Sequence, residues 1–251
     1  MIRGVLLDLS GVLYIGDEPV AGAVTAVKRL ASAGLPVRYI TNTTRSTRHM
    51  ILQRLTRLGF DIAAKDVFTA PVASRQYVET NNLIPFLLIH PNLEPEFSDM
   101  AGEPNAVLVG DAGDRFTYDS MNEAFRYLLD GAILLAMGMN RYFSEGELFS
   151  LDAGPFVHAL EFASGTKAII LGKPSLEFYS IAINSLGCNP EDTVMVGDDV
   201  EADVLGAVNA GLNGILVRTG KYIQGDEKKI KTSALCVADI SAAVDYILEQ
   251  I

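Results

Sequence analysis

The chain has 251 residues, of which 49% are hydrophobic and 8% aromatic, and its formal net charge is -11. This length and apolar content suit one large globular domain or two small ones. The acidic balance argues against a broad nucleic-acid surface, because binding along a phosphate backbone requires clustered Lys and Arg.

No run of about 18 uncharged apolar residues occurs, and the N-terminus lacks the charged and apolar regions of a secretion signal. The two cysteines, Cys188 and Cys236, form no CxxC pair and are interpreted as buried, reduced thiols. We therefore expect a cytoplasmic protein that binds neither nucleic acid nor membrane.

Strand-like and helix-like segments alternate over the first part of the chain. The first apolar run ends at Asp8 and leads into the turn-prone Ser10 and Gly11, which is typical of a buried strand. The next segment carries apolar residues three positions apart and stops at Gly34, as an amphipathic helix does. The predicted elements are a strand over residues 4–7, a helix over 21–33, a strand over 37–40 and a helix over 50–58.

The same alternation returns in the last third of the chain. Alternating strands and helices predict right-handed βαβ units, and hence an α/β fold with a doubly wound, Rossmann-like parallel sheet. The ligand site of such a sheet lies beyond the carboxyl ends of its strands. The elements predicted here are strands over residues 168–171, 193–196 and 214–217, and helices over 176–186, 201–210 and 240–248.

The middle of the chain has its own strand candidates, and we interpret it as a second α/β domain inserted into the first. The predicted core domain is therefore discontinuous, with residues 1–78 and 168–251, and the inserted domain covers residues 79–167. The inserted elements are strands over residues 86–89, 106–109 and 133–136 and a helix around 121–129.

Four polar clusters each follow an apolar strand. A single acidic residue in such a place is typical of a turn or a helix cap. Together, however, the clusters offer a nucleophile, a cation and metal ligands, which are the groups that phosphoryl transfer requires. The clusters are Asp8-Leu9-Ser10-Gly11, Thr41-Asn42, Lys173-Pro174, and Gly197-Asp198-Asp199 with the nearby Asp203.

Each residue type in these clusters has a chemical role available to it. The Asp8 carboxylate can attack phosphorus to form an acyl phosphate, and with Asp198 it can bind Mg²⁺, which prefers carboxylate oxygen. Thr41 offers a hydroxyl group, the backbone around Asn42 offers amide donors, and Lys173 offers a compact positive charge for a phosphate oxygen.

The order of these clusters resembles the haloacid dehalogenase (HAD) superfamily over nearly the whole chain. The place of the insertion, with residues 66–70 and 218–221, is similar to the NagD-like group (subfamily IIA), whose members carry a large C2-type cap domain. Further segments resemble the branch of phospholysine phosphohistidine inorganic pyrophosphate phosphatase and the HAD-like hydrolase domain-containing 2 proteins. Those segments are residues 8–13, 116–118, 121–122, 154–156 and 172–175.

The resemblance implies a role for each candidate residue. Asp8 would be the nucleophile and a metal ligand, and the backbone carbonyl of Ser10 and the carboxylate of Asp198 would complete the protein's Mg²⁺ ligands. Thr41, Asn42 and Lys173 would hold the phosphate. Asp199 and Asp203 would orient the metal or its water molecules, although Asp203 could instead brace the helix that follows it.

Ser10 departs from the superfamily pattern, in which most phosphatases carry a second Asp that protonates the leaving group. A backbone carbonyl ligand survives this exchange, but the acid is lost. We therefore expect a preference for easy leaving groups, as in pyrophosphate, aryl phosphates and phosphoramidates such as phospholysine or phosphohistidine. The alternative is a catalytically weak protein that binds phosphate ligands or takes part in phospho-signalling.

The inserted domain is expected to select the substrate, because a cap that closes over a phosphate site can contact the leaving group. Arg115, Tyr118 and Arg141 are candidate selecting residues. The apolar side chains within residues 143–149 could support a homodimer or, equally, the small core of the cap itself.

Overall fold

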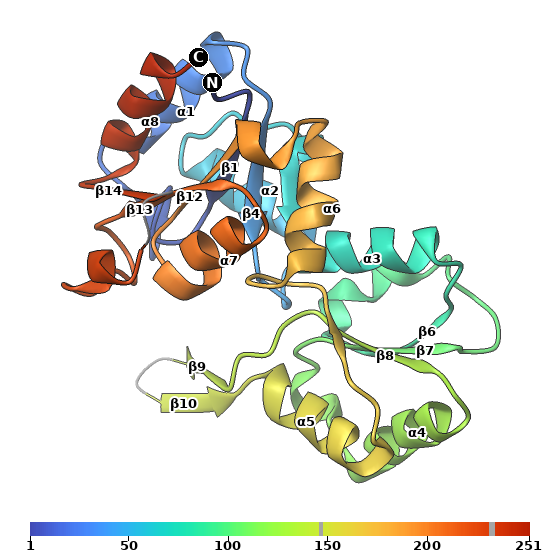
Figure 1. Cartoon of the computed structure of the whole chain (residues 1–251). Helices are drawn as coiled ribbons and strands as arrows, with labels where there is room; N and C mark the ends of the chain where they lie inside the picture. The colour runs from blue at the N-terminus through green and yellow to red at the C-terminus, as the bar shows by residue number, and fades with distance from the viewer. Residues whose placement is uncertain (146–147, 231–233) are drawn as a thin grey trace. The chain divides into compact units, whose positions relative to one another are not determined.

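The computed structural model describes residues 1–145, 148–230 and 234–251. The chain folds into two compact units, each made of segments that are distant in the sequence (Figure 1). The first unit comprises Met1–Thr41, Arg48–Phe68 and Lys173–Ile251, and the second comprises Asn42–Thr47 and Thr69–Gly172.

The first unit is built on a six-stranded sheet whose order is β14-β13-β12-β1-β4-β5. The pairings from β14 through β4 are parallel, so the carboxyl ends of β12, β1 and β4 meet at one edge. The strands are β1 (Gly4–Asp8), β4 (Val37–Thr41), β5 (Val67–Thr69), β12 (Thr193–Gly197), β13 (Asn213–Val217) and β14 (Ala234–Val237).

Helices cover both faces of this sheet. Alternate strand residues such as Val5 and Val194 pack with Leu30 of α1 and Ile247 of α8 in one large apolar cluster. On the other face Leu216 packs against Val200 and Val204 of η5. The helices are α1 (Ala23–Ser32), α2 (Arg48–Arg57), α6 (Leu176–Leu186), α7 (Gly206–Asn209) and α8 (Ile240–Glu249), with a π-helical segment η5 (Val200–Leu205) directly before α7.

The second unit has its own parallel sheet of four strands in the order β11-β8-β7-β6. Its core places Val107 and Leu134 of this sheet against Leu128 of α4 and Val157 of α5. The elements are β6 (Pro85–Leu88), β7 (Ala106–Val109), β8 (Ile133–Ala136), β11 (Ile169–Ile170), α3 (Ala70–Thr80), α4 (Tyr118–Leu129), α5 (Ala153–Ser164) and the hairpin β9 (Tyr142–Glu145) and β10 (Leu148–Leu151).

Short elements complete both units. A hairpin of β2 and β3 is the next element after β1 and begins at Tyr14. The short elements are β2 (Tyr14–Ile15), β3 (Glu18–Pro19) and the 3-10 turns η1 (Ala64–Asp66), η2 (Pro91–Phe97), η3 (Gly113–Arg115), η4 (Pro190–Asp192) and η6 (Asp226–Lys228). In the part of the chain that the structure describes, no helix is long and apolar enough to cross a membrane.

The expected α/β fold, with a doubly wound parallel core and an additional α/β unit, is confirmed. One strand was assigned to the wrong sheet: β11, expected over residues 168–171 in the core, pairs with β8 in the second unit. The helix expected over residues 201–210 is a π-helical segment followed by the short α7. The predicted cap range 79–167 lies inside the second unit, which also takes in α3.

The two cysteines differ from their expected state. Both are free thiols, but Cys188 and Cys236 are partly exposed rather than buried. The reason is their position, because Cys188 lies in the turn after α6 and Cys236 lies on β14, the edge strand of the core sheet.

Candidate active site

Three polar residues meet at the carboxyl edge of the core sheet. Asp8 is the last residue of β1, Thr41 is the last residue of β4, and Asp198 follows β12 directly. Because β12, β1 and β4 are neighbours in the parallel sheet, these side chains come together. All three are buried, and Asp198 is only 2% exposed.

Lys173 brings a positive charge into this group. Its Nζ atom lies 2.5 Å from Oδ1 of Asp8 and 2.6 Å from Oδ1 of Asp203. The Lys173 side chain is 5% exposed, so both ion pairs are shielded from solvent. In the first unit, therefore, one ammonium group bridges the predicted nucleophile and an acid from η5.

Both carboxylate oxygens of Asp203 accept a hydrogen bond, and the backbone around it is also fixed. Its second oxygen, Oδ2, accepts a hydrogen bond from the backbone amide of Asp199 at 3.1 Å. The one hydroxyl hydrogen of Tyr179 is shared between the carbonyl oxygens of Ala202 and Asp203, each 2.9 Å from the hydroxyl oxygen, which fixes this turn of η5. A Cβ atom on Gly197 would overlap the Asp203 side chain, so that position requires glycine.

Asp198 is positioned by the loop after β13. The backbone amide of Lys221 donates to Oδ2 of Asp198 at 2.6 Å. Gly11 and Gly220 have φ angles of +87° and +58°, and a Cβ atom on either residue would overlap the Asp198 carboxylate. Two glycines from separate loops therefore enclose this acid.

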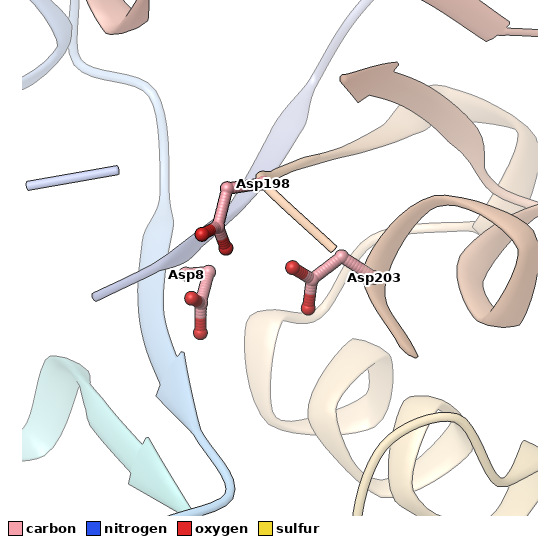
Figure 2. A group of neighbouring side chains, drawn as sticks. All are labelled: Asp8, Asp198 and Asp203. Atoms are coloured by element: carbon pink, nitrogen blue, oxygen red, sulfur yellow. The ribbon is translucent and has the colours of Figure 1, made fainter. Parts of the chain in front are cut away.

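The Asp8, Asp198 and Asp203 side chains face one another (Figure 2), and one oxygen from each lies within 4.8 Å of the others. Among the described residues this is the only such group of three acidic, His or Cys side chains. Three buried carboxylates outnumber the one ammonium group of Lys173, and carboxylate oxygen is the donor that Mg²⁺ prefers. The residues therefore fit a divalent cation.

Burial and the neighbouring charges change the acid strength of these side chains. Burial raises the pKa of Asp8 to about 7, with Lys173 opposing the shift and Asp203 adding to it. Burial likewise raises the pKa of Asp198 to about 6, against the hydrogen bond from the Lys221 amide. Burial would lower the pKa of Lys173, but the two adjacent carboxylates outweigh it and raise that pKa. The site therefore favours a bound positive charge.

The remaining predicted site residues lie close to this group in the chain. Ser10 is exposed, and its neighbour Gly11 donates its backbone amide to the Tyr14 carbonyl at 2.7 Å. Asp199 caps η5 by accepting from the amides of Glu201 and Ala202. Burial would raise the Asp199 pKa, but the hydrogen bond from the Ala202 amide and the ammonium group of Lys221 outweigh it and lower that pKa.

Asn42 follows Thr41 directly but groups with the second unit. There its Oδ1 atom lies 3.1 Å from the position that a Cβ atom on Gly172 would occupy. The structure thus brings Asp8, Thr41, Lys173 and Asp198 together within the first unit. Asn42 lies in the second unit, beside Gly172, which is the last residue of that unit.

Sequence reasoning gave no role to Thr219, Gly220, Lys221 or Tyr179. The first three follow β13 at the same carboxyl edge of the sheet. The rule that identified Asp8 and Asp198, polar residues directly after a buried strand, would have identified them as well. Tyr179 lies within α6 and carries no such signal.

The second unit contains a polar cluster of its own. Nε of Arg45 forms an ion pair with Oδ2 of Asp111, which is 4% exposed, and the guanidinium carbon of Arg45 lies 4.4 Å from the centre of the Phe143 ring. Asp111 also accepts from the amide of Gly113 at 3.2 Å. Of the cap residues expected to select substrate, Arg115 pairs with Glu94, whereas Tyr118 and Arg141 are exposed.

Comparisons with known families agree with this geometry. The family model described as haloacid dehalogenase-like hydrolase matches residues 5–101, and a second, HAD-hydrolase-like, matches residues 170–243. Haloacid dehalogenase-like hydrolase domain-containing protein 2 of Bos taurus is 45% identical in an alignment that covers 100% of this chain and 97% of the relative. Phospholysine phosphohistidine inorganic pyrophosphate phosphatase of Danio rerio is 43% identical over 98% of this chain and 94% of its own length.

Solved structures show the same fold. NagD from E. coli K-12 superposes with a TM-score of 0.85 and 25% identity, over 96% of this chain and 97% of its own. A 4-nitrophenylphosphatase from Thermotoga maritima superposes with a TM-score of 0.88 and 24% identity, over 98% and 97% of the two chains.

Proposed function

The chain belongs to the haloacid dehalogenase-like hydrolases and is NagD-like, and from this membership we propose that it is a Mg²⁺-dependent phosphatase with Asp8 as its nucleophile. The observation that carries the proposal is the buried arrangement around Asp8. The Lys173 ammonium group lies 2.5 Å from this carboxylate, and Asp198 stands with it at the same sheet edge. The groups that we propose as nucleophile, phosphate-binding cation and metal ligand therefore lie close together, which supports the proposal.

In the proposed reaction one oxygen of Asp8 attacks phosphorus. The bond from phosphorus to the leaving group breaks, and an aspartyl phosphate forms on Asp8, which water then hydrolyses to release inorganic phosphate. Lys173 and the Thr41 hydroxyl would bind phosphate oxygens, with Asn42 contributing from the adjacent position. Asp8, Asp198 and the Ser10 carbonyl would hold Mg²⁺, which when bound neutralises charge on the phosphate.

Ser10 sets the expected substrate class. General acid catalysis contributes about 10² to 10⁴ in rate, or roughly 3 to 5 kcal/mol of barrier, and a serine hydroxyl does not supply it. We infer that the enzyme favours pyrophosphate, aryl phosphates and phosphoramidates over alkyl phosphates. The names of two relatives, a phospholysine phosphohistidine inorganic pyrophosphate phosphatase and a 4-nitrophenylphosphatase, support this class.

A homodimer is a separate proposal. Its support is the β9–β10 hairpin, where Leu148 and Phe149 are 75% and 73% exposed. Large exposed apolar side chains that are close together favour a protein contact. Light scattering combined with size exclusion would test it, and a monomeric mass at all concentrations would exclude it.

The proposed activity is tested by phosphate release from pyrophosphate, p-nitrophenyl phosphate, a phosphoramidate and an alkyl phosphate, each with Mg²⁺ and with EDTA. Asp8→Asn is the control, because it keeps the shape of the side chain and removes the nucleophile. We expect Mg²⁺-dependent turnover that is lost in the variant and is slowest for the alkyl ester. Phosphate binding without turnover of any substrate would favour the phosphate-binding alternative instead.

A further inference from the structure

The loop that follows β13, residues 219–221, contacts both sides of the acidic site but has no role in the proposed reaction. We propose that this loop is a positioning element for the metal site and that Thr219 is its central positioning residue. The inference rests on the proposed function, because it takes Asp198 and the Ser10 carbonyl as metal ligands. It adds residues that touch neither metal nor substrate but determine where the ligands point.

The first contact fixes Asp198. The Lys221 backbone amide donates to Oδ2 at 2.6 Å, and the absence of a Cβ atom on Gly220 leaves just enough room for the carboxylate. A hydrogen bond to one carboxylate oxygen orients the whole group, so the other oxygen, Oδ1, is directed away from the loop. Partners of this kind typically change metal affinity when they are lost.

The second contact fixes the backbone at Ser10. Thr219 Oγ1 donates to the Gly11 carbonyl at 2.5 Å, and the Gly11 amide donates to the Tyr14 carbonyl at 2.7 Å. Both peptide planes next to Gly11 are therefore anchored. In a planar trans peptide the carbonyl points opposite to the amide, so the bond to Tyr14 also directs the Ser10 carbonyl. Thr219 stabilises this arrangement through its hydrogen bond to the Gly11 carbonyl.

The loop itself is anchored to the sheet. The Arg218 amide donates to the carbonyls of Val237 and Ala238 at 3.1 and 3.2 Å, where β14 ends. The loop that carries Thr219 is therefore held by the edge of the sheet and not by Asp198 or Gly11, the residues that it positions. A support that is independent of the metal ligands can orient them before the metal arrives, which lowers the cost of ordering the site.

The decisive variant is Thr219→Val, which keeps the shape of the side chain and removes the hydroxyl group. We expect the Mg²⁺ dissociation constant, measured by isothermal titration calorimetry without substrate, to rise about 3- to 10-fold, in line with the loss of one hydrogen bond. The Mg²⁺ concentration for half-maximal p-nitrophenyl phosphate turnover should rise equally, and kcat at saturating Mg²⁺ should stay near the wild-type value. Thr219→Ser restores the donor and should restore both constants.

Thr193→Val is the matched control. The Thr193 hydroxyl donates to the Asn189 carbonyl at 2.8 Å, in the same unit but at the opposite end of β12. Its loss should lower the melting temperature without changing the Mg²⁺ dissociation constant. If Thr219→Val does not fold, Thr219→Ala removes the same hydroxyl group with a smaller side chain, and the same constants are read from it.

Each outcome has a defined meaning. Wild-type Mg²⁺ affinity in a folded Thr219→Val protein would overturn the positioning role while leaving the proposed function intact. A lower affinity that Thr219→Ser does not restore would also overturn it, because the hydroxyl group would not be the cause. If Asp198→Asn leaves Mg²⁺ binding unchanged, the metal site of the proposed function itself is wrong, and the inference fails with it.

Discussion

Lys173 and Asp8 form a buried ion pair in which 2.5 Å separates Nζ from Oδ1 and the side chains are 5% and 9% exposed. The same ammonium group also binds Asp203, and Asp198 completes a group of three buried acids. The ammonium group of Lys173 thus neutralises part of the negative charge of the three carboxylates, and a divalent cation would neutralise the rest. The stability and the pH response of the protein should both depend on this charge excess.

Removal of the Lys173 charge should destabilise the metal-free protein. We expect Lys173→Met to lower the free energy of unfolding, measured by urea titration in EDTA near neutral pH, by about 3 kcal/mol, because it leaves buried carboxylates without their partner. Phosphatase activity should be lost as well, since the cation that would bind the phosphate is gone.

Lys221→Met is the matched comparison for that variant. The Lys221 ammonium group lies 3.3 Å from Asp199, but its side chain is 72% exposed. Exposed pairs contribute at most about 1 kcal/mol, so this variant should stay close to the wild type. Its backbone amide, which binds Asp198, is retained. Equal losses of stability in the two lysine variants would contradict the importance of burial.

Stabilisation by Mg²⁺ should increase with pH. The folded-state pKa values of Asp8 and Asp198, about 7 and about 6, lie above the ordinary value of 3.8. Between pH 4 and 7, roughly, the metal-free folded state therefore holds protons that the unfolded chain has released, and its stability falls as pH rises. Mg²⁺ must displace these protons, so binding weakens in acid.

Calorimetric melting with excess MgCl₂ and with EDTA checks this expectation. The gain in melting temperature from Mg²⁺ should be clearly larger at about pH 8 than at about pH 5.5, and Mg²⁺ binding at intermediate pH should release protons into the buffer. The Asp8→Asn variant should show a smaller pH dependence, because one of the two titrating groups is gone. A gain that is the same at both pH values would exclude these carboxylates as the metal-linked groups.

The positions of Asp8, Thr41 and Asp198 could be predicted because they depend on topology alone. Parallel strands place their carboxyl ends at one edge, and apolar runs that stop at polar residues reveal where those ends are. The contact between Lys173 and Asp203 could not be predicted in this way. It depends on the direction of the Lys173 side chain and on the π-helical turn at η5. No repeating pattern of apolar residues in the sequence predicts either of them.

The misassigned β11 illustrates the same limit. The apolar run at Ile169 and Ile170 predicts a buried strand. The two residues do form a strand, which is only partly buried, but an apolar run does not specify which sheet it joins. The strand pairs with β8, where Ile169 lies opposite Leu135, and the chain returns to the first unit only at Lys173. Pairing between strands is decided by tertiary contacts, which short apolar runs leave open.

Introduction of an acid at Ser10 should broaden the substrate range. We expect Ser10→Asp to raise kcat/KM for an alkyl phosphate at least tenfold relative to pyrophosphate, because a general acid helps poor leaving groups most. The Ser10 side chain is exposed, so a carboxylate can be accommodated. Ser10→Asn has the same shape without the acid and should leave the ratio unchanged. If the asparagine variant shifts the ratio as far as the aspartate does, proton transfer is not the cause.

Two glycines with almost the same backbone conformation allow a test of the space around Asp198. Gly220 has a φ angle of +58° and Gly16 one of +55°, but a Cβ atom on Gly220 would overlap Asp198 and Gly11, whereas one on Gly16 meets nothing within 4 Å. Gly16→Ala should therefore carry only the cost of a left-handed conformation, about 1 kcal/mol in the free energy of unfolding.

Gly220→Ala should carry that conformational cost and, in addition, displace the Asp198 carboxylate. We expect its Mg²⁺ dissociation constant to rise at least tenfold, the size of effect that follows when a partner orienting a metal ligand is lost. Titration calorimetry on both alanine variants separates the backbone effect from the displacement of Asp198. Both variants carry the cost of a left-handed alanine, but only Gly220→Ala places a methyl group against the Asp198 carboxylate. If the two variants bind Mg²⁺ equally well, the loop after β13 yields to the added methyl group and does not fix the position of Asp198.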